Sequence, residues 1–153
     1  MSMDFGVYPR RQQPVTPAEI VSGLRARGIE AVWESSRPRE PDRASGHLRA
    51  ADARQPSPAV DLSTEPLDPA HRQSLIESYS SVLTPAQTKA LSAATAEQMV
   101  SAPWSQPVSA SPFLAHLIDL LAELGDGLII DMQTNETYDR SDFRKLNAAA
   151  LGT

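Results

Sequence analysis

The chain contains no cysteine, which excludes disulfide-stapled scaffolds and thiolate metal sites. Aromatic residues make up only 5%, and two lysines stand beside twelve arginines. No apolar run approaches the ~18 residues that cross a bilayer, and the N-terminal MSMDFGVYPRR lacks the apolar core of a signal peptide. We therefore expect a cytoplasmic protein with no membrane partner. The arginine- and alanine-rich composition is typical of a bacterial source.

The motifs of the common enzyme classes are also missing. The sequence has no GxSxG nucleophile elbow, no HExxH zinc motif, and no GxxxxGK[ST] or GxGxxG phosphate loop. No segment combines a nucleophile, a base and an orienting group. We expect no catalytic residue, no metal ligand and no cofactor, and a protein that is not an enzyme.

Charge is distributed unevenly along the chain. The net charge is −5, but residues 1–54 hold nine arginines against seven acidic residues, whereas residues 55–153 hold five basic residues against twelve acidic ones. An acidic half repels nucleic acid phosphates and attracts a basic surface. The charge pattern therefore favours a basic protein partner and disfavours nucleic acid.

The N-terminal third predicts a strand, a helix and a second strand. Residues 3–8 alternate apolar and polar side chains, as a half-buried strand does. Thr16 and Glu19 have the spacing of a capping box at the start of a helix over 17–27. A second alternating segment, residues 29–34, completes a β-α-β unit.

Residues 35–67 break this pattern. The stretch is rich in proline and arginine and has almost no large apolar residue in its first half. Such a composition buries too little surface to offset chain entropy, so it predicts a long flexible loop. A basic arm that contacts a partner is the alternative interpretation.

Helical periodicity returns in the second half, and the last strands form a hairpin. The expected helices cover residues 69–83, 85–101 and 112–124, and the expected hairpin strands cover 127–131 and 137–139. At 153 residues the chain is long enough for one domain, 1–153. The predicted fold class is α+β, a small sheet made of the β-α-β unit and the hairpin, covered by about four helices.

The hairpin region, GDGLIIDMQTNETYDRSDF, gathers most of the C-terminal carboxylates. From Asp131 onwards it follows an EF-hand register, but Glu136 replaces the required glycine and Asp142 replaces the terminal glutamate. The sequence therefore favours a hairpin over a calcium loop, with Asn135 in a left-handed turn position. If the carboxylates form a docking surface, the partner-binding residues are Asp126, Asp131, Glu136, Asp139 and Asp142.

One further group of polar residues lies on the apolar helix. His116, Asp119 and Glu123 share a helical stripe, which the sequence favours as the solvent-exposed face of that helix. The alternative is a small enzyme or metal-dependent domain that uses His116, Asp119 and Asp131.

The order apolar helix, glycine, strand GLIIDMQTNETY and Ser-Asp-Phe covers about 30 of the 153 residues. It resembles a terminal pattern of small bacterial α/β proteins, some of them immunity partners of secreted toxins. The resemblance implies a protein-binding role without catalysis and carries no site residues. We expect a non-catalytic protein-binding protein, an immunity protein that neutralises a bacterial toxin. An accessory or chaperone-like subunit with residues 35–67 as its binding arm is a further alternative.

Overall fold

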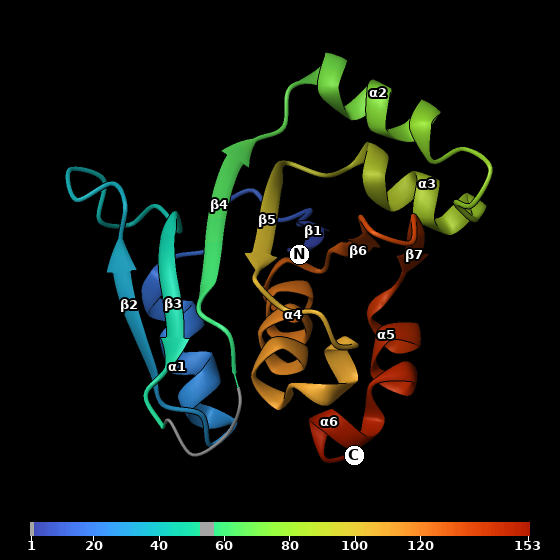
Figure 1. Cartoon of the computed structure of the whole chain (residues 1–153). Coiled ribbons are helices and arrows are strands. Elements are labelled where there is room, and N and C mark those ends of the chain that lie inside the picture. Colours follow the sequence, from blue (N-terminus) through green and yellow to red (C-terminus); the bar gives the residue numbers. More distant parts are fainter. Residues whose placement is uncertain (1, 53–56) are drawn as a thin grey trace.

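A computed structural model describes residues 2–52 and 57–153 of the chain (Figure 1). Within these residues seven strands form one sheet: β1 (Met3–Tyr8), β2 (Ala31–Ser35), β3 (Gly46–Ala50), β4 (Val60–Pro66), β5 (Ala96–Ala102), β6 (Leu128–Asp131) and β7 (Glu136–Tyr138). The helices are α1 (Pro17–Ala26), α2 (Pro69–Ser78), α3 (Pro85–Ser92), the 3-10 turn η1 (Val108–Ala110), α4 (Pro112–Gly125), α5 (Arg140–Leu146) and α6 (Ala148–Leu151). The fold is α+β, as the sequence predicts.

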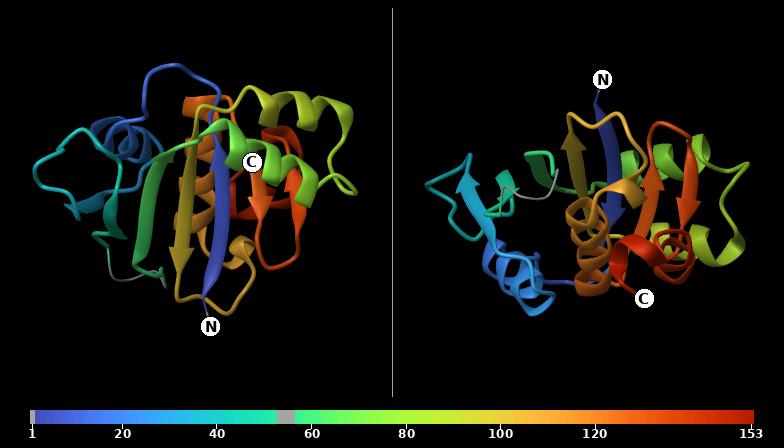
Figure 2. Two further views of the ribbon diagram at one scale, coloured as in Figure 1. Left: turned by 90° about the horizontal axis from the view of Figure 1, so that it is seen from above. Right: turned by 60° about the horizontal axis from the view of Figure 1, so that its bottom comes forward.

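The strand order is β2-β3-β4-β5-β1-β6-β7, and every neighbouring pair is antiparallel. Seen from above in Figure 2 (left), β4, β5 and β1 lie side by side at the centre of the sheet. β1 and β2 run in the same direction, because four antiparallel pairings separate them. The expected β-α-β unit therefore exists in chain order, but three other strands lie between its two strands.

Alternation along the strands sends side chains into two cores on opposite faces. On β6, Ile129 points into the main core with α1, α4, α5 and α6, whereas Leu128 and Ile130 point into a smaller core with α2 and α3. Tyr8 of β1 joins the smaller core. In Figure 1, α2 and α3 stand apart from the other helices. Helices α1, α4, α5 and α6 thus cover one face of the sheet, whereas α2 and α3 cover only one end of the opposite face.

The prediction of a helix over residues 85–101 is wrong beyond α3. Residues 96–102 form β5, which lies between β1 and β4. Gln98, Val100 and Ala102 are buried at every second position, the periodicity of a strand. The capping box at Thr84 fixes only the start of the helix, and pairing with two strands determines the conformation of residues 96–102. The helix expected over 69–83 likewise ends at Ser78.

The prediction that residues 35–67 form a loop is also wrong where β3 and β4 occur. These strands are one-sided: Leu48, Val60 and Leu62 are fully or almost fully buried, and the alternating residues His47, Arg49, Asp61 and Ser63 are exposed. Because only every second residue of such a strand is apolar, the mean hydropathy of the segment is low. Composition alone therefore does not reveal these two strands. Residues 53–56 of the predicted loop lie outside the described residues.

The locally determined elements are confirmed. The Thr16–Glu19 capping box begins α1, and β6 pairs with β7 in the predicted hairpin, with Asn135 in a left-handed conformation at φ 60°. α4 covers 112–125, one residue longer than expected. In the part of the chain that the structure describes, no helix has the length and apolarity needed to span a membrane.

Candidate functional site

The most concentrated polar group of the main core surrounds Asp119 on α4. Its side chain is 0% exposed and accepts hydrogen bonds from three arginines. Arg27 and Arg144 donate to Oδ2 at 2.7 and 2.6 Å, and Arg140 donates to both oxygens, at 3.0 Å to Oδ1 and 3.3 Å to Oδ2. We call these four residues the arginine–aspartate centre. It joins α1, α4 and α5 through one carboxylate.

Local sequence explains how the three arginines converge. Arg27 is the C-cap residue of α1, so its side chain leaves the end of that helix towards α4. Arg140 and Arg144 are four residues apart on α5 and therefore lie on one side of that helix. Asp139 caps α5 by accepting a hydrogen bond from the backbone N–H of Asp142, which fixes where α5 begins.

The surroundings of Asp119 and His116 determine their charge. Burial raises the pKa of Asp119, but hydrogen bonds from Arg140 and Arg27 and their positive charges outweigh burial, so the pKa lies below its ordinary value. Burial and the charge of Arg27 lower the pKa of His116, whose Nδ1 lies 3.3 Å from Nη1 of Arg27. The aspartate is therefore ionised and the histidine neutral at pH 7.

The interpretation of His116, Asp119 and Glu123 as a wholly solvent-exposed face is therefore wrong for Asp119. Glu123 is half-exposed and His116 is partly buried. Asp131, the third residue of the alternative enzymatic set, belongs to a different hollow, and its Oδ1 accepts from the turn amide of Gln133 at 2.9 Å. An aspartate within an apolar helix stretch, LIDLL, is the sequence signal that could have indicated a buried carboxylate at this position.

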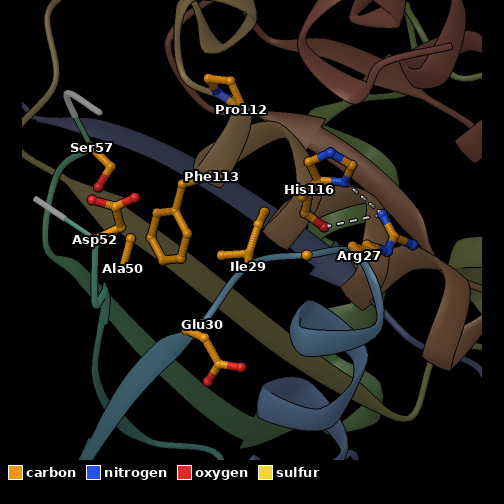
Figure 3. Close-up of a pocket in the computed structure, with 10 residues that line it drawn as sticks. Arg27, Ile29, Glu30, Ala50, Asp52, Ser57, Pro112, Phe113 and His116 are labelled. Carbon is orange, nitrogen blue, oxygen red and sulfur yellow. Dashed lines mark hydrogen bonds between the residues drawn. The ribbon is translucent and has the colours of Figure 1, made fainter. Parts of the chain in front are cut away.

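A hollow of about 270 Å³ opens beside the arginine–aspartate centre, between the α1–β2 turn, the end of β3 and the start of α4 (Figure 3). Phe113 and Ile29 lie between Asp52 on one side and the pair Arg27–His116 on the other. Arg27 and His116 also line a second hollow of about 400 Å³. The two side chains thus line both spaces.

The five predicted partner-binding carboxylates occupy the C-terminal part of the chain, and several have local roles. Asp126, in a left-handed conformation at φ 50°, forms an ion pair with Arg10. Glu136 accepts a hydrogen bond from the Tyr138 hydroxyl at 2.7 Å. Asp131 and Glu136 are cross-strand neighbours, and Asp139 and Asp142 share the first turn region of α5, so the five do not form one continuous row.

The remaining feature is the sheet face opposite the main core. α2 and α3 pack over the β1–β6 end of that face, whereas outward side chains of β2, β3 and β4 are exposed. One transverse line of cross-strand neighbours crosses five strands: Glu34, His47, Asp61, Ser101 and Asp4. We call this line the acidic row, since it holds three carboxylates and neither lysine nor arginine.

Hydrogen bonds connect parts of the acidic row. His47 Nδ1 contacts the Asp61 carboxylate, and the Ser101 hydroxyl donates to Asp4. The side chains of His47 and Asp61 are 59% and 71% exposed, so the row is open to a partner. Sequence analysis missed it because β3 and β4 fell within the predicted loop. Across residues 2–52 and 57–153, no group of three or more histidine, aspartate or glutamate side chains is placed to hold a metal ion.

No family model, no curated protein and no solved structure matches the chain.

Proposed function

We propose that the chain is a non-catalytic protein-binding protein, an immunity protein that neutralises a bacterial toxin inside the cytoplasm. The observation that carries the proposal is the acidic row on the open sheet face. Three carboxylates lie on three different strands of this face, with Glu34 and Asp61 exposed and Asp4 half-buried, and such an arrangement suits a basic protein surface. The C-terminal order of apolar helix, glycine, strand and Ser-Asp-Phe resembles a pattern of small bacterial α/β proteins, some of them immunity partners of toxins, and supports the same role.

The acidic row suits docking better than the C-terminal carboxylates do. The Glu34 side chain forms no hydrogen bond or ion pair within the described residues, and the Asp61 side chain bonds only His47 there. In contrast, Asp126 already forms an ion pair with Arg10, and Asp139 already accepts the N-cap hydrogen bond of α5. A carboxylate without a cationic partner gains most when a basic partner arrives. We therefore propose the row as the contact surface and the C-terminal carboxylates as contributors to long-range attraction.

The arginine–aspartate centre offers little support for the enzymatic alternative. A carboxylate that accepts from three guanidinium groups is a weak base, and Asp131 does not join it. The accessory-subunit alternative assigns residues 35–67 to a free arm, but this segment contributes β3 and β4 to the sheet. No observation favours either alternative over a binding role.

The proposal is tested with two matched charge reversals. Glu34→Lys with Asp61→Lys changes the acidic row, and Glu136→Lys with Asp142→Lys makes the same charge change at the C-terminal end. The probe is the purified, inactivated protein encoded by the gene next to that of this chain. We expect the first pair to slow association about tenfold or more at low salt, and the second about twofold.

Stopped-flow association at several ionic strengths gives the rates, and circular dichroism verifies that both variants are folded. Equal slowing by the two pairs would contradict the choice of the acidic row. Association at the wild-type rate by both variants, or no complex with the probe, would count against a basic toxin as the partner.

A further inference from the structure

Glu123 occupies the outer side of the arginine–aspartate centre. Its Oε2 accepts from Nη2 of Arg27 at 3.3 Å and from Nη2 of Arg140. Asp119 holds the same two arginines from the buried side. The two guanidinium groups therefore lie between a fixed inner carboxylate and an outer one, and the Glu123 side chain is 47% exposed.

The space around this outer side is accessible and basic. The hollow of about 400 Å³ is lined by Arg27, Arg140 and Arg144 on a floor that includes Leu120 and Leu124. A neighbouring hollow of about 480 Å³ shares Arg140 and Arg144 and adds Lys145. The side chains of Arg140 and Arg144 are 36% and 34% exposed, so both are partly open to solvent while Asp119 bonds their guanidinium groups.

The charges around the two hollows favour an anion. Arg27, Arg140, Arg144 and Lys145 bring four positive charges, against two from Asp119 and Glu123, in a chain whose net charge is −5. Within the described residues, Arg144 donates from Nη1 alone, which leaves its Nε and Nη2 for a ligand. Planar guanidinium groups held in fixed orientation match the oxygens of an oxyanion.

We propose that Arg27, Arg140 and Arg144 form a binding site for a phosphate-bearing ligand, which Glu123 occupies when the ligand is absent. Asp119 positions the three arginines from below. The Glu123 carboxylate bonds two of the three arginines, whereas a phosphate presents three acceptor oxygens and a larger charge. A phosphate can therefore displace Glu123, and the apolar floor can receive an organic part of the ligand. The site is independent of the acidic row.

Glu123→Gln is the decisive variant, because it removes the competing charge and leaves the three arginines and Asp119 unchanged. We expect this variant to bind inorganic phosphate about tenfold more tightly than the wild type, since one charged competitor has been lost. Glu30→Gln is the matched control. Glu30 is also an exposed glutamate paired with an arginine, Arg25, but lies outside the hollow of about 400 Å³.

Isothermal titration calorimetry at constant ionic strength, with chloride as the balancing anion, gives the dissociation constants. Adding Arg144→Gln to Glu123→Gln should remove most of the gain, and Arg144→Lys should retain part of it because the positive charge stays. Phenyl phosphate distinguishes the ligand source: tighter binding than inorganic phosphate indicates an organic phosphate, and equal binding indicates the free anion.

Three outcomes would overturn the proposal. Glu123→Gln and Glu30→Gln could show the same phosphate affinity as the wild type. Phosphate could bind no better than chloride in any variant. Finally, Arg144→Gln could leave the affinity of the Glu123→Gln background unchanged, as judged on protein that circular dichroism shows to be folded.

Discussion

Asp119 and Asp139 both stabilise α5, but from opposite environments. Asp119 reaches α5 from within α4, with a side chain that is 0% exposed and bonds to arginines from two helices. Asp139 precedes α5, is exposed, and accepts from one backbone N–H of that helix. Asp119 connects segments that are distant in sequence, whereas Asp139 stabilises only the first turn of its own helix.

The difference shows what burial does to a carboxylate. A buried carboxylate requires several cationic partners to offset its lost hydration, and those partners then depend on it. An exposed carboxylate keeps its water and contributes only the local hydrogen bond. Asp119 should therefore matter far more for stability than any carboxylate of the C-terminal hairpin region, although all carry the same charge.

The largest effect should come from Asp119→Asn. The substitution leaves three arginines at the centre without their shared anion, and we expect the free energy of unfolding to fall by about 3 kcal/mol. Urea unfolding followed by circular dichroism measures this loss. Asp142→Asn, an exposed control, should change stability by about 0.5 kcal/mol or less. A loss below about 1 kcal/mol for Asp119→Asn would remove the contrast between the two regions.

The second largest effect should come from low pH, which should reduce the stability that the buried Asp119 contributes. The folded-state pKa of Asp119 lies below its ordinary value of about 3.9, so the folded state binds the proton less readily than the unfolded state. The contribution of Asp119 to stability is therefore complete above pH 4 to 5. It is lost as the pH falls through the lowered folded pKa.

Urea unfolding of the wild type and of Asp119→Asn between pH 6 and pH 2.5 measures this contribution as the difference between the two curves. The difference should be constant above pH 5 and should shrink at lower pH. A difference that stays constant down to pH 2.5 would mean that Asp119 titrates alike in both states.

Asp139→Ala should have a smaller effect of about 1 kcal/mol, the usual cost of losing a helix N-cap. Asp139→Asn keeps the hydrogen-bond acceptor and removes the charge, so it should retain most of the stability. Thermal unfolding of the two variants side by side separates cap from charge. Equal losses in both would show that the charge of Asp139 matters more than its cap.

Calcium should have no effect. In the EF-hand register, Asp131 is occupied by turn amides and Asn135 takes the left-handed position of a hairpin. We expect millimolar calcium to leave the melting temperature unchanged. A stabilisation of about 2 kcal/mol or more would show that the carboxylates of the hairpin bind the ion.

Local signals account for the elements that the sequence predicts correctly. Thr16–Glu19, the turn at Asn135 and the apolar period of α4 each depend on residues within about one helix or hairpin, so their elements are predicted. β5 comes after a helix start and contains small residues, and it becomes a strand only through pairing with β1 and β4. Periodicity within one segment cannot show such pairing.

The same distinction applies to the candidate sites. The C-terminal carboxylates are close together in sequence, and the sequence pattern reveals them for that reason. The acidic row joins five strands, and the partners of Asp119 lie 92, 21 and 25 residues away along the chain. The acidic row depends on the strand order, and the partners of Asp119 depend on how α1 and α5 pack against α4. Sequence alone singles out Asp119 as a candidate residue but predicts neither its burial, nor its arginines, nor the row.

The proposed function depends above all on the partner binding the open sheet face. Nuclear magnetic resonance spectra of the isotopically labelled chain, titrated with the inactivated product of the neighbouring gene, test this binding mode most directly. We expect the backbone signals of Glu34, His47 and Asp61 to shift or broaden first, with those of residues 126–142 little changed. Perturbations centred on residues 126–142, with the acidic row unaffected, would contradict this binding mode.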